Sequence, residues 1–267
     1  LLKGDNIMVE IPKSHPRRNS LLSRKMIVEA TKKGLLADSA MIAHGRGEAF
    51  DYLLGEKTSN SARLAIKESA ARLVSSKNPV ISINGNTAVL AGKSLIRVAA
   101  VLNCPIEINI YYRTDERINN IYSLLEEEKK ILCQENAPKN WKGDWKSAIM
   151  SVEILGKEND GRIDGLEGPR SICSANGIQK ADVILVPLED GDRCEALVSL
   201  GKQVLVVDLN PLSRTAKMAT VTIVDEISRA AKLILEEVIE NDLRPTEWNN
   251  DKILIQALEV IANNVKA

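Results

Sequence analysis

The chain has 267 residues, a mass of 29.3 kDa, and 36 basic and 36 acidic side chains, so its formal net charge is zero. A neutral chain with 3% aromatic residues is unlike proteins that hold nucleic acids by bulk positive charge or by base stacking. We therefore expect no nucleic-acid partner, and a core large enough for a single domain over residues 1–267.

The cysteines and the hydropathy pattern favour a cytoplasmic protein. The four cysteines, at positions 104, 133, 173 and 194, form no C-x-x-C pair, and only His15 and His44 could help a metal site. We expect reduced thiols and no structural metal. No apolar run approaches the ~18 residues of a membrane span, and residues 1–6 lack the apolar stretch of a secretory signal.

The N-terminal part, residues 8–76, is predicted to form a helical layer. Its three predicted helices cover residues 21–33, 37–54 and 61–74. Gly34 suits the end of the first helix, and Asn60 is the expected cap of the third. Gly45 and Gly47 are expected to interrupt the second helix, because an interior glycine costs about 1 kcal/mol.

From Pro79 onward, short β-branched segments alternate with helical ones. Six strands are predicted, over residues 80–83, 106–111, 151–155, 183–186, 204–207 and 221–224. Helices are predicted over residues 88–102, 115–133, 227–239 and 249–267. Several strands are apolar throughout, which is typical of a parallel sheet buried on both faces. The pattern predicts an α/β fold: a Rossmann-like, mostly parallel sheet over residues 79–243 with helices on both faces.

Residues 126–146 stand apart from this alternation. They contain an acidic cluster, Pro138, and Trp141 and Trp145 among lysines. We predict that this segment is an insertion into the core.

Asn84, Gly85, Asn86 and Thr87 follow a predicted buried strand and open a helix. Free N–H groups at a helix start attract phosphate or carboxylate, Gly85 would let a ligand approach, and Asn86 or Thr87 could cap the helix. A plain strand-to-helix turn explains the same residues equally well. The nearby Gly92-Lys93-Ser94 is not a P-loop, because Thr87 stands where that motif needs glycine.

Polar residues also follow the strand predicted over residues 204–207. Asp208 and Asn210 stand at its carboxyl end, where open α/β sheets bind ligands, and Arg214 could pair with phosphate oxygens. A solvated surface turn is the competing interpretation. Arg46 lies between two glycines, and the neighbouring His44 is either an acid–base group or a buried, hydrogen-bonded histidine.

Glu189, Asp190 and Asp192 follow another predicted strand. Carboxylates there could hold Mg²⁺ through water. A charged turn in which Asp192 caps a helix is slightly favoured, so no metal ligand is assigned.

Several long segments together resemble one family, the archaeal 4-phosphopantoate–β-alanine ligases, also called phosphopantothenate synthetases. The segments are IPKSHPR at 11–17, IAHGRGEAFDYL at 42–53, INGN at 83–86, YYRTDER at 111–117, KADVILVPLEDGDR at 180–193, DLNPLSRTA at 208–216 and TIVDEI at 222–227. They occur in the family's order, from about residue 9 to 239.

The resemblance implies a homodimeric, ATP-dependent ligase with a Rossmann-like fold. It would condense 4-phosphopantoate with β-alanine through an acyl-adenylate, releasing AMP and pyrophosphate in coenzyme A biosynthesis. The implied ATP contacts are Arg24, Arg46, Asp208, Leu209, Asn210, Arg214, Thr215, Glu226 and Ile227. We expect Arg46 and Arg214 to be the catalytic cations, and Mg²⁺ to accompany ATP.

We also expect Asn84, Gly85, Asn86, Thr87 and Arg113 to bind 4-phosphopantoate, with its phosphate at the Asn84–Thr87 helix start. The alternative is a regulatory protein that binds ATP without turnover. An NAD-dependent oxidoreductase is disfavoured, because no G-x-G-x-x-G follows a predicted strand.

Overall fold

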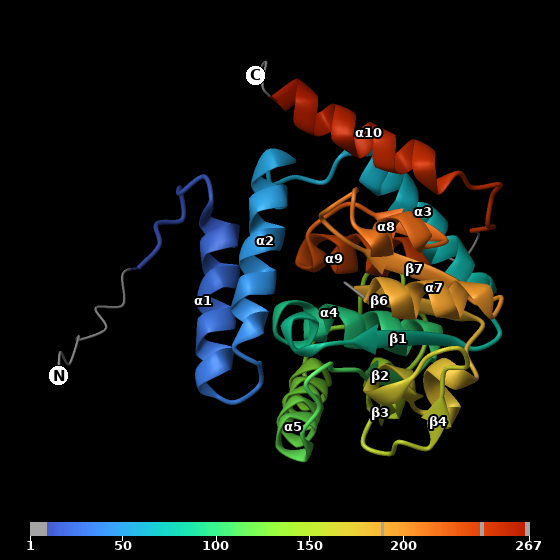
Figure 1. The fold of residues 1–267 in the computed structure, drawn as a ribbon. Coiled ribbons are helices and arrows are strands. Elements are labelled where there is room, and N and C mark those ends of the chain that lie inside the picture. The colour runs from blue at the N-terminus through green and yellow to red at the C-terminus, as the bar shows by residue number, and fades with distance from the viewer. Residues whose placement is uncertain (1–9, 188–189, 241–242, 265–267) are drawn as a thin grey trace.

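A six-stranded parallel sheet forms the centre of the computed structural model, in the order β3-β2-β1-β6-β7-β8 (Figure 1). The strands are β1 (Pro79–Ile83), β2 (Ile106–Ile108), β3 (Ile154–Leu155), β6 (Val183–Pro187), β7 (Gln203–Val207) and β8 (Val221–Ile223). Strands β1, β2 and β3 form one half of the sheet and β6, β7 and β8 the other, so the strand order changes direction between β1 and β6. This is the doubly wound order of the Rossmann fold. The predicted fold class is confirmed.

The structure describes residues 10–187, 190–240 and 243–264. Residues 8 and 9 of the predicted helical layer, Glu189 of the acidic turn and the last three residues of the helix predicted over 249–267 lie outside the described residues.

Helices cover both faces of the sheet because successive side chains of each strand point to opposite faces. Ile81 and Ile83 of β1 face the larger core, with α3 (Asn60–Ser75), α4 (Gly85–Leu102), α5 (Asp115–Leu132), α6 (Trp145–Ser151) and α9 (Ile227–Ile239). Val80 faces the smaller core, with α7 (Gly191–Ser199) and the five-residue helix α8 (Arg214–Met218).

Three helices pack around this layered centre. Helices α1 (Arg18–Lys32) and α2 (Ser39–Leu53) lie side by side, beside the end of the sheet toward which β1 points (Figure 1). Helix α10 (Asn250–Asn263) contacts α3, α8 and β8. Beside α7, a small antiparallel pair forms from β4 (Gly161–Arg162) and β5 (Ile172–Cys173). No helix in the described ranges is both long and apolar enough to cross a membrane.

The prediction that Gly45 and Gly47 interrupt helix α2 is wrong. The helix runs without a break from Ser39 to Leu53, through both Gly45 and Gly47. A β-carbon on Gly45 would meet open space, and one on Gly47 would lie 3.4 Å from Leu209 Cδ1. The free-energy cost of two interior glycines is therefore offset by the packing of α2 against α1 and α4. At Gly47 the helix backbone lies close to the loop after β7.

The predicted ends of three elements also differ from the structure. Ser59, not Asn60, caps α3, because its hydroxyl accepts a hydrogen bond from Ala62 N at 3.1 Å. Strand β2 ends at Ile108, and β3 begins only at Ile154 because Ser151 still belongs to α6. β-Branched composition marked these strands correctly, but it did not mark where their hydrogen bonding stops.

The segment predicted as an insertion is partly continuous with the core. Residues 126–132 form the last turns of α5, and Trp145 at the start of α6 is buried in the larger core. Its ring packs edge-on against Trp141, with centroids 5.5 Å apart. That residues 126–146 are an insertion stays a prediction.

Glu128 on α5 gives a testable link between pH and stability. Its Oε2 is buried with no hydrogen-bond partner among the described residues, and burial raises the pKa of its carboxyl to about 7, against the attraction of Lys93. The folded state therefore binds this proton more tightly than the unfolded chain. The stabilisation by that proton is complete below the unfolded pKa and is lost as the pH rises through 7.

We expect Glu128→Gln to raise the free energy of unfolding by about 1–3 kcal/mol at pH 8, because it removes a buried charge. Near pH 4 the wild-type carboxyl is neutral in both states, and the gain should vanish. Denaturant unfolding at both pH values measures this. An equal gain at pH 4 and pH 8 would contradict the assigned titration.

Candidate functional site

A cavity of about 700 Å³ lies at the carboxyl edge of the sheet, between that edge and helices α1 and α2. Its volume falls within the roughly 300–1,000 Å³ of small-molecule sites. Parallel strands bring their carboxyl ends to one edge, so residues after β1, β6, β7 and β8 meet there. The described side chains that line it include Ser23, His44, Arg46, Glu48, Asn84, Asn86, Thr87, Asp208, Leu209, Asn210, Thr215, Glu226, Ile227 and Lys232.

The loop after β7 is held by Asp208. Its carboxylate is 5% exposed and accepts hydrogen bonds from Asn210 N, at 2.9 Å, and from the Ser213 hydroxyl. Burial raises the pKa of Asp208, while these two donors oppose the shift. Asp208 therefore shapes the predicted ATP loop from inside.

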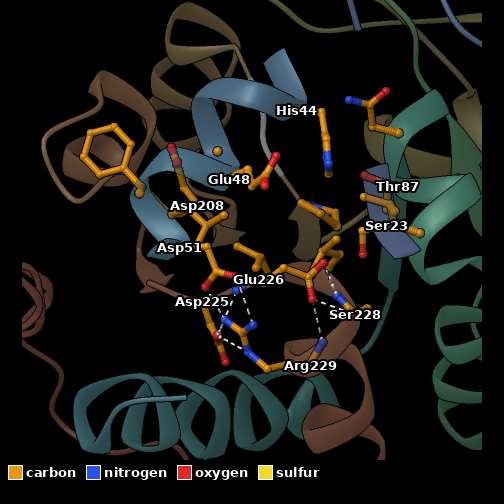
Figure 2. Close-up of a pocket in the computed structure, with 18 of the residues that line it drawn as sticks. Ser23, His44, Glu48, Asp51, Thr87, Asp208, Asp225, Glu226, Ser228 and Arg229 are labelled. Carbon is orange, nitrogen blue, oxygen red and sulfur yellow. Dashed lines mark hydrogen bonds and ion pairs between the residues drawn. The ribbon is translucent and has the colours of Figure 1, made fainter. Parts of the chain in front are cut away.

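Glu226 begins the next helix along the same edge. As the N-cap of α9, its carboxylate accepts from Ser228 N at 3.0 Å and from Arg229 N at 3.2 Å. Figure 2 shows Glu226, Asp208 and Glu48 around the cavity, with His44 reaching toward it from α2. The edge thus combines carboxylates, backbone donors and apolar side chains.

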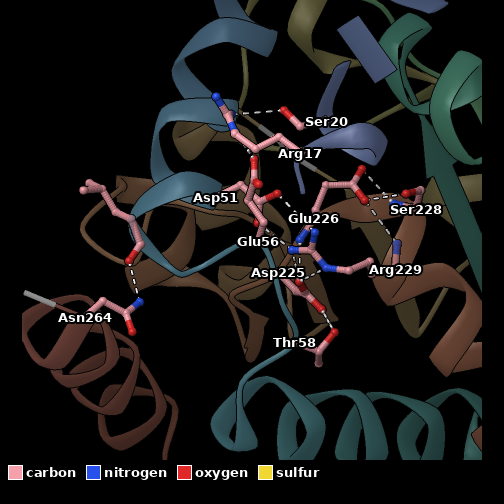
Figure 3. Close-up of polar contacts among 11 residues, drawn as sticks. Arg17, Ser20, Asp51, Glu56, Thr58, Asp225, Glu226, Ser228, Arg229 and Asn264 are labelled. Atoms are coloured by element: carbon pink, nitrogen blue, oxygen red, sulfur yellow. Dashed lines mark hydrogen bonds and ion pairs between the residues drawn. The ribbon is translucent and has the colours of Figure 1, made fainter. Parts of the chain in front are cut away.

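A buried ion-pair network joins α2 to α9 at one side of the cavity. The Arg229 guanidinium donates to both oxygens of Asp51, with the Nη1–Oδ2 distance at 3.1 Å, and its Nε donates to Asp225 Oδ1 at 3.0 Å (Figure 3). Thr58 donates to the other Asp225 oxygen at 2.6 Å. Burial opposes the charge of Arg229, but the two carboxylates outweigh it and raise its pKa.

The α1–α2 wall carries a second group of charges. Glu48 lines the cavity and accepts from Arg24 Nη2 at 2.6 Å and from Ser20 Oγ at 2.8 Å. Burial opposes ionisation of Glu48, but these donors and the charges of Arg24 and Arg17 hold its pKa below the usual value. Arg24 itself is exposed at the rim, and Arg46 lines the cavity directly.

His44 is partly buried on the same wall. Its Nε2 has no hydrogen-bond partner among the described residues, and burial lowers the pKa of its imidazole, against the charges of Glu48 and Glu226. The ring is therefore held toward its neutral form, which can accept a proton.

The helix start after β1 is capped by Asn84 rather than by Asn86 or Thr87. Asn84 Oδ1 accepts from Thr87 N at 3.0 Å and from the Thr87 hydroxyl at 3.1 Å. Asn86 Nδ2 donates to Ala40 O at 3.0 Å, and its buried Oδ1 has no partner among the described residues. Gly85 does not line the cavity: a β-carbon there would lie 2.7 Å from Leu36, so glycine serves helix packing rather than ligand approach.

Besides Arg24 at the rim, two predicted site arginines lie outside the large cavity. Arg214 is 60% exposed, and its guanidinium pairs with Asp192 and Glu195 of α7. Arg113 lines a second cavity of about 170 Å³, which shares Asn84 and Pro187 with the first. The structure thus brings together every other predicted ATP and substrate residue except Arg24 and Gly85.

The acidic turn after β6 serves α7. Asp190, not Asp192, caps this helix by accepting from Asp192 N at 2.9 Å, and Asp192 pairs with Arg170 at 2.6 Å. Asp190 immediately precedes α7, so its carboxylate can reach a free N–H group of the first turn, whereas Asp192 is itself part of that turn. Within the described ranges, no three His, Cys, Asp or Glu side chains are grouped to hold a metal ion.

Several cavity residues were missed from the sequence. Asp51, Asp225 and Arg229 are separated by up to 178 residues, and Ser20 and Ser23 lie in a helix without a motif. The segment containing Asp225 was recognised, but its pairing with α2 depends on the tertiary fold.

A doubly wound parallel sheet, with a large cavity where the strand order changes direction, defines a class of α/β ligand-binding proteins. Within this class, the chain belongs to the phosphopantothenate/pantothenate synthetase family, whose sequence model matches residues 61–264.

Curated relatives support this membership over most of the chain. It is 50% identical over 229 residues to a 4-phosphopantoate–β-alanine ligase of Thermococcus kodakarensis, covering 86% of this chain and 80% of the relative. It is 44% identical to the ligase of Methanospirillum hungatei, covering 87% and 86%. The ligase of Methanosarcina mazei is 39% identical, with 97% of each chain covered.

Proposed function

We propose that this chain is an ATP-dependent ligase that condenses 4-phosphopantoate with β-alanine to give 4-phosphopantothenate, AMP and pyrophosphate. The observation that carries the proposal is its identity of 39–50% with curated ligases of that name over most of its length. The large cavity at the carboxyl edge supports it, because its volume suits a nucleotide and a small acid together.

The proposed chemistry has two steps. A carboxylate oxygen of 4-phosphopantoate attacks the α-phosphorus of ATP, the bond to the bridging oxygen breaks, and pyrophosphate leaves. The β-alanine nitrogen then attacks the acyl carbon, AMP leaves with the oxygen that came from the carboxylate, and the nitrogen loses its proton. The protein contributes by holding the reactants in line and by stabilising the phosphate charge.

The site residues have proposed roles in these steps. Arg46 would stabilise the ATP phosphates, and the loops that carry Asp208–Asn210, Thr215 and Glu226–Ile227 would hold the nucleotide; each of these lines the cavity. Arg24, at the rim, would exchange Glu48 for a phosphate oxygen. Arg214 would likewise have to leave Asp192 and Glu195 before it could contact ATP.

Mg²⁺ is proposed only as a companion of the ATP phosphates. The described carboxylates of the cavity accept hydrogen bonds from the protein, and none of them forms a three-ligand group. These residues do not fit a preformed protein cage for the ion. Mg²⁺ usually keeps several waters and binds through substrate phosphates, so no step is assigned to it here.

A homodimer in the cytoplasm is the proposed assembly. Support comes from exposed apolar side chains on the paired helices α1 and α2, including Met26, Met41, Ile42 and Leu53.

Asn84→Ala is expected to raise the Michaelis constant for 4-phosphopantoate and to leave that for ATP nearly unchanged. Asn84 lies between the two cavities, and its loss frees the first N–H groups of α4 from their cap. A hydrogen bond to a charged group contributes about 1.5–3 kcal/mol, so the expected increase is about ten- to a hundredfold. Steady-state kinetics with each substrate varied in turn measures this, and weakened ATP binding alone would contradict the assignment.

The competing function is an ATP-binding regulator without turnover. An assay of AMP and pyrophosphate formation from ATP distinguishes the two functions. It is run with 4-phosphopantoate and β-alanine together, with each alone and with neither. Release that requires 4-phosphopantoate and becomes continuous with β-alanine supports the ligase. Bound ATP that is never cleaved would support the regulator.

A further inference from the structure

His44 combines features that no other described titratable side chain of the large cavity has. It lines the cavity, its Nε2 is buried, and that nitrogen has no hydrogen-bond partner among the described residues. Figure 2 shows the ring directed into the cavity from α2. A buried polar atom without a partner is costly, so this nitrogen indicates a contact with a bound reactant.

Asn86 contributes a second unpartnered atom to the same part of the cavity. Its Nδ2 donates to the carbonyl oxygen of Ala40, one turn before His44 on α2, and its buried Oδ1 has no partner among the described residues. Because Nδ2 is occupied, Asn86 offers only an acceptor to a ligand. Ionised phosphate and carboxylate groups also only accept, so the reactant group that meets Asn86 carries an N–H or O–H.

The carboxylates of the cavity are already occupied as hydrogen-bond acceptors. Each one that lines the cavity in the described ranges accepts from the protein, namely Glu48, Asp51, Asp208, Asp225 and Glu226. Lys232 lines the cavity too, but an ammonium group only donates. Among the described side chains of the cavity, His44 is therefore the titratable group whose basic atom is available to a reactant.

The surroundings of His44 favour its neutral imidazole. Burial lowers the pKa from the ordinary value of 6.5 and the charge of Arg24 adds to this, whereas the carboxylates of Glu48 and Glu226 oppose the shift. The other charged side chains of the cavity lie on α2, after β7 and β8 and on α9, and they are Arg46, Asp51, Asp208, Asp225, Arg229 and Lys232. With the ring proton on Nδ1, Nε2 offers a lone pair near neutral pH.

We infer that His44 is the general base that accepts a proton from the β-alanine nitrogen as the amide forms. This inference rests on the proposed function. Hydroxyl groups and the adenine amine could also donate to His44 and Asn86, but only the β-alanine nitrogen must lose a proton in the proposed reaction.

The proposed proton transfer belongs to the second step. The ammonium of β-alanine first gives one proton to water, and its neutral nitrogen then bonds to the acyl carbon. The bond between that carbon and the AMP oxygen breaks. The proton that the nitrogen still has to lose passes to His44 Nε2, and the imidazolium returns it to solvent.

The test separates the two steps with hydroxylamine, a neutral and strong nucleophile whose attack on an acyl-adenylate depends little on a protein base. His44→Gln should slow 4-phosphopantothenate formation from 4-phosphopantoate, ATP and β-alanine about 10²–10⁴-fold. Pyrophosphate release in a single turnover without β-alanine should stay near the wild-type rate, and so should hydroxamate formation when hydroxylamine replaces β-alanine.

The pH dependence of the wild type gives an independent readout. Below the pKa of His44, the second step should slow about tenfold per pH unit beyond the decrease caused by protonation of β-alanine. His44→Gln should lose this additional dependence. The wild-type measurement keeps the test valid if His44→Gln does not fold.

His15→Gln is the matched control, because His15 lines neither cavity and its Nδ1 accepts from Arg17 N at 3.1 Å. This variant should keep the wild-type rates and the wild-type pH dependence.

Two results would overturn the assignment. If His44→Gln slowed pyrophosphate release and hydroxamate formation as much as amide formation, His44 would act in adenylation instead. Unchanged amide formation in His44→Gln, or a wild type without the additional pH dependence, would exclude His44 as the base. Failure of the proposed function is different, because the wild type itself would then release no pyrophosphate from ATP and 4-phosphopantoate.

Discussion

Arg229→Met is expected to lower the free energy of unfolding by about 3–5 kcal/mol, which is a large part of the 5–15 kcal/mol typical of a domain. The reason is the uncompensated charge that it leaves. Asp51 and Asp225 are 5% and 2% exposed, and Arg229 binds both. Without the guanidinium, two buried carboxylates would face each other, and one of them would have to take up a proton.

Two further variants distinguish the loss of charge from the loss of side-chain packing. Adding Asp51→Asn and Asp225→Asn to Arg229→Met should recover most of the lost stability, because neutral side chains of similar shape remain. Arg97→Met is the control, since its pair with Glu135 is partly exposed and should contribute about 0–1 kcal/mol. Denaturant unfolding measures all three. Equal losses in Arg229→Met and Arg97→Met would contradict the buried network.

Arg46→Ala is expected to reduce kcat/KM for ATP about a hundredfold or more. Arg46 lies on α2 and lines the large cavity, where its charge would stabilise phosphate oxygens during adenylation. Removing one preorganised donor to such a centre costs about 10²–10³ in rate. Because the first step would be impaired, pyrophosphate release in a single turnover without β-alanine should slow by the same factor.

Arg63→Ala is the control for this loss of charge. Arg63 is exposed on α3 and lines neither cavity, so its variant should keep wild-type kinetics. If Arg46→Ala changed only the constant for β-alanine, the proposed contact with ATP would be wrong.

The sequence predicted those parts of the fold that depend on local pattern. The apolar residues at helical spacing gave helix Ile227–Ile239 with its observed bounds, and the β-branched runs marked all six strands of the sheet. Local pattern was less informative for α2, whose two glycines suggested breaks. The contacts of α2 with α1 and α4 hold that helix together, and these contacts are not visible in its own residues.

The candidate site was predictable where its residues follow strands. Asp208, Asn210 and Asn84 could be placed because parallel strands bring their carboxyl ends to one edge. Contacts between distant segments were not predictable. Nothing near Arg214 indicates that Asp192 and Glu195 lie beside it, and nothing near Arg193 indicates that Glu107 fixes its position through Asn109. Such pairings depend on the three-dimensional fold.

The central claim is that the chain activates a carboxylate by adenylation. The most direct test uses 4-phosphopantoate labelled with ¹⁸O in its carboxylate, incubated with ATP, Mg²⁺ and β-alanine, with the products analysed by mass spectrometry. The proposed reaction predicts one ¹⁸O atom in each AMP formed, because the attacking carboxylate oxygen leaves with the α-phosphorus. Label in inorganic phosphate together with ADP, or AMP without label, would contradict it.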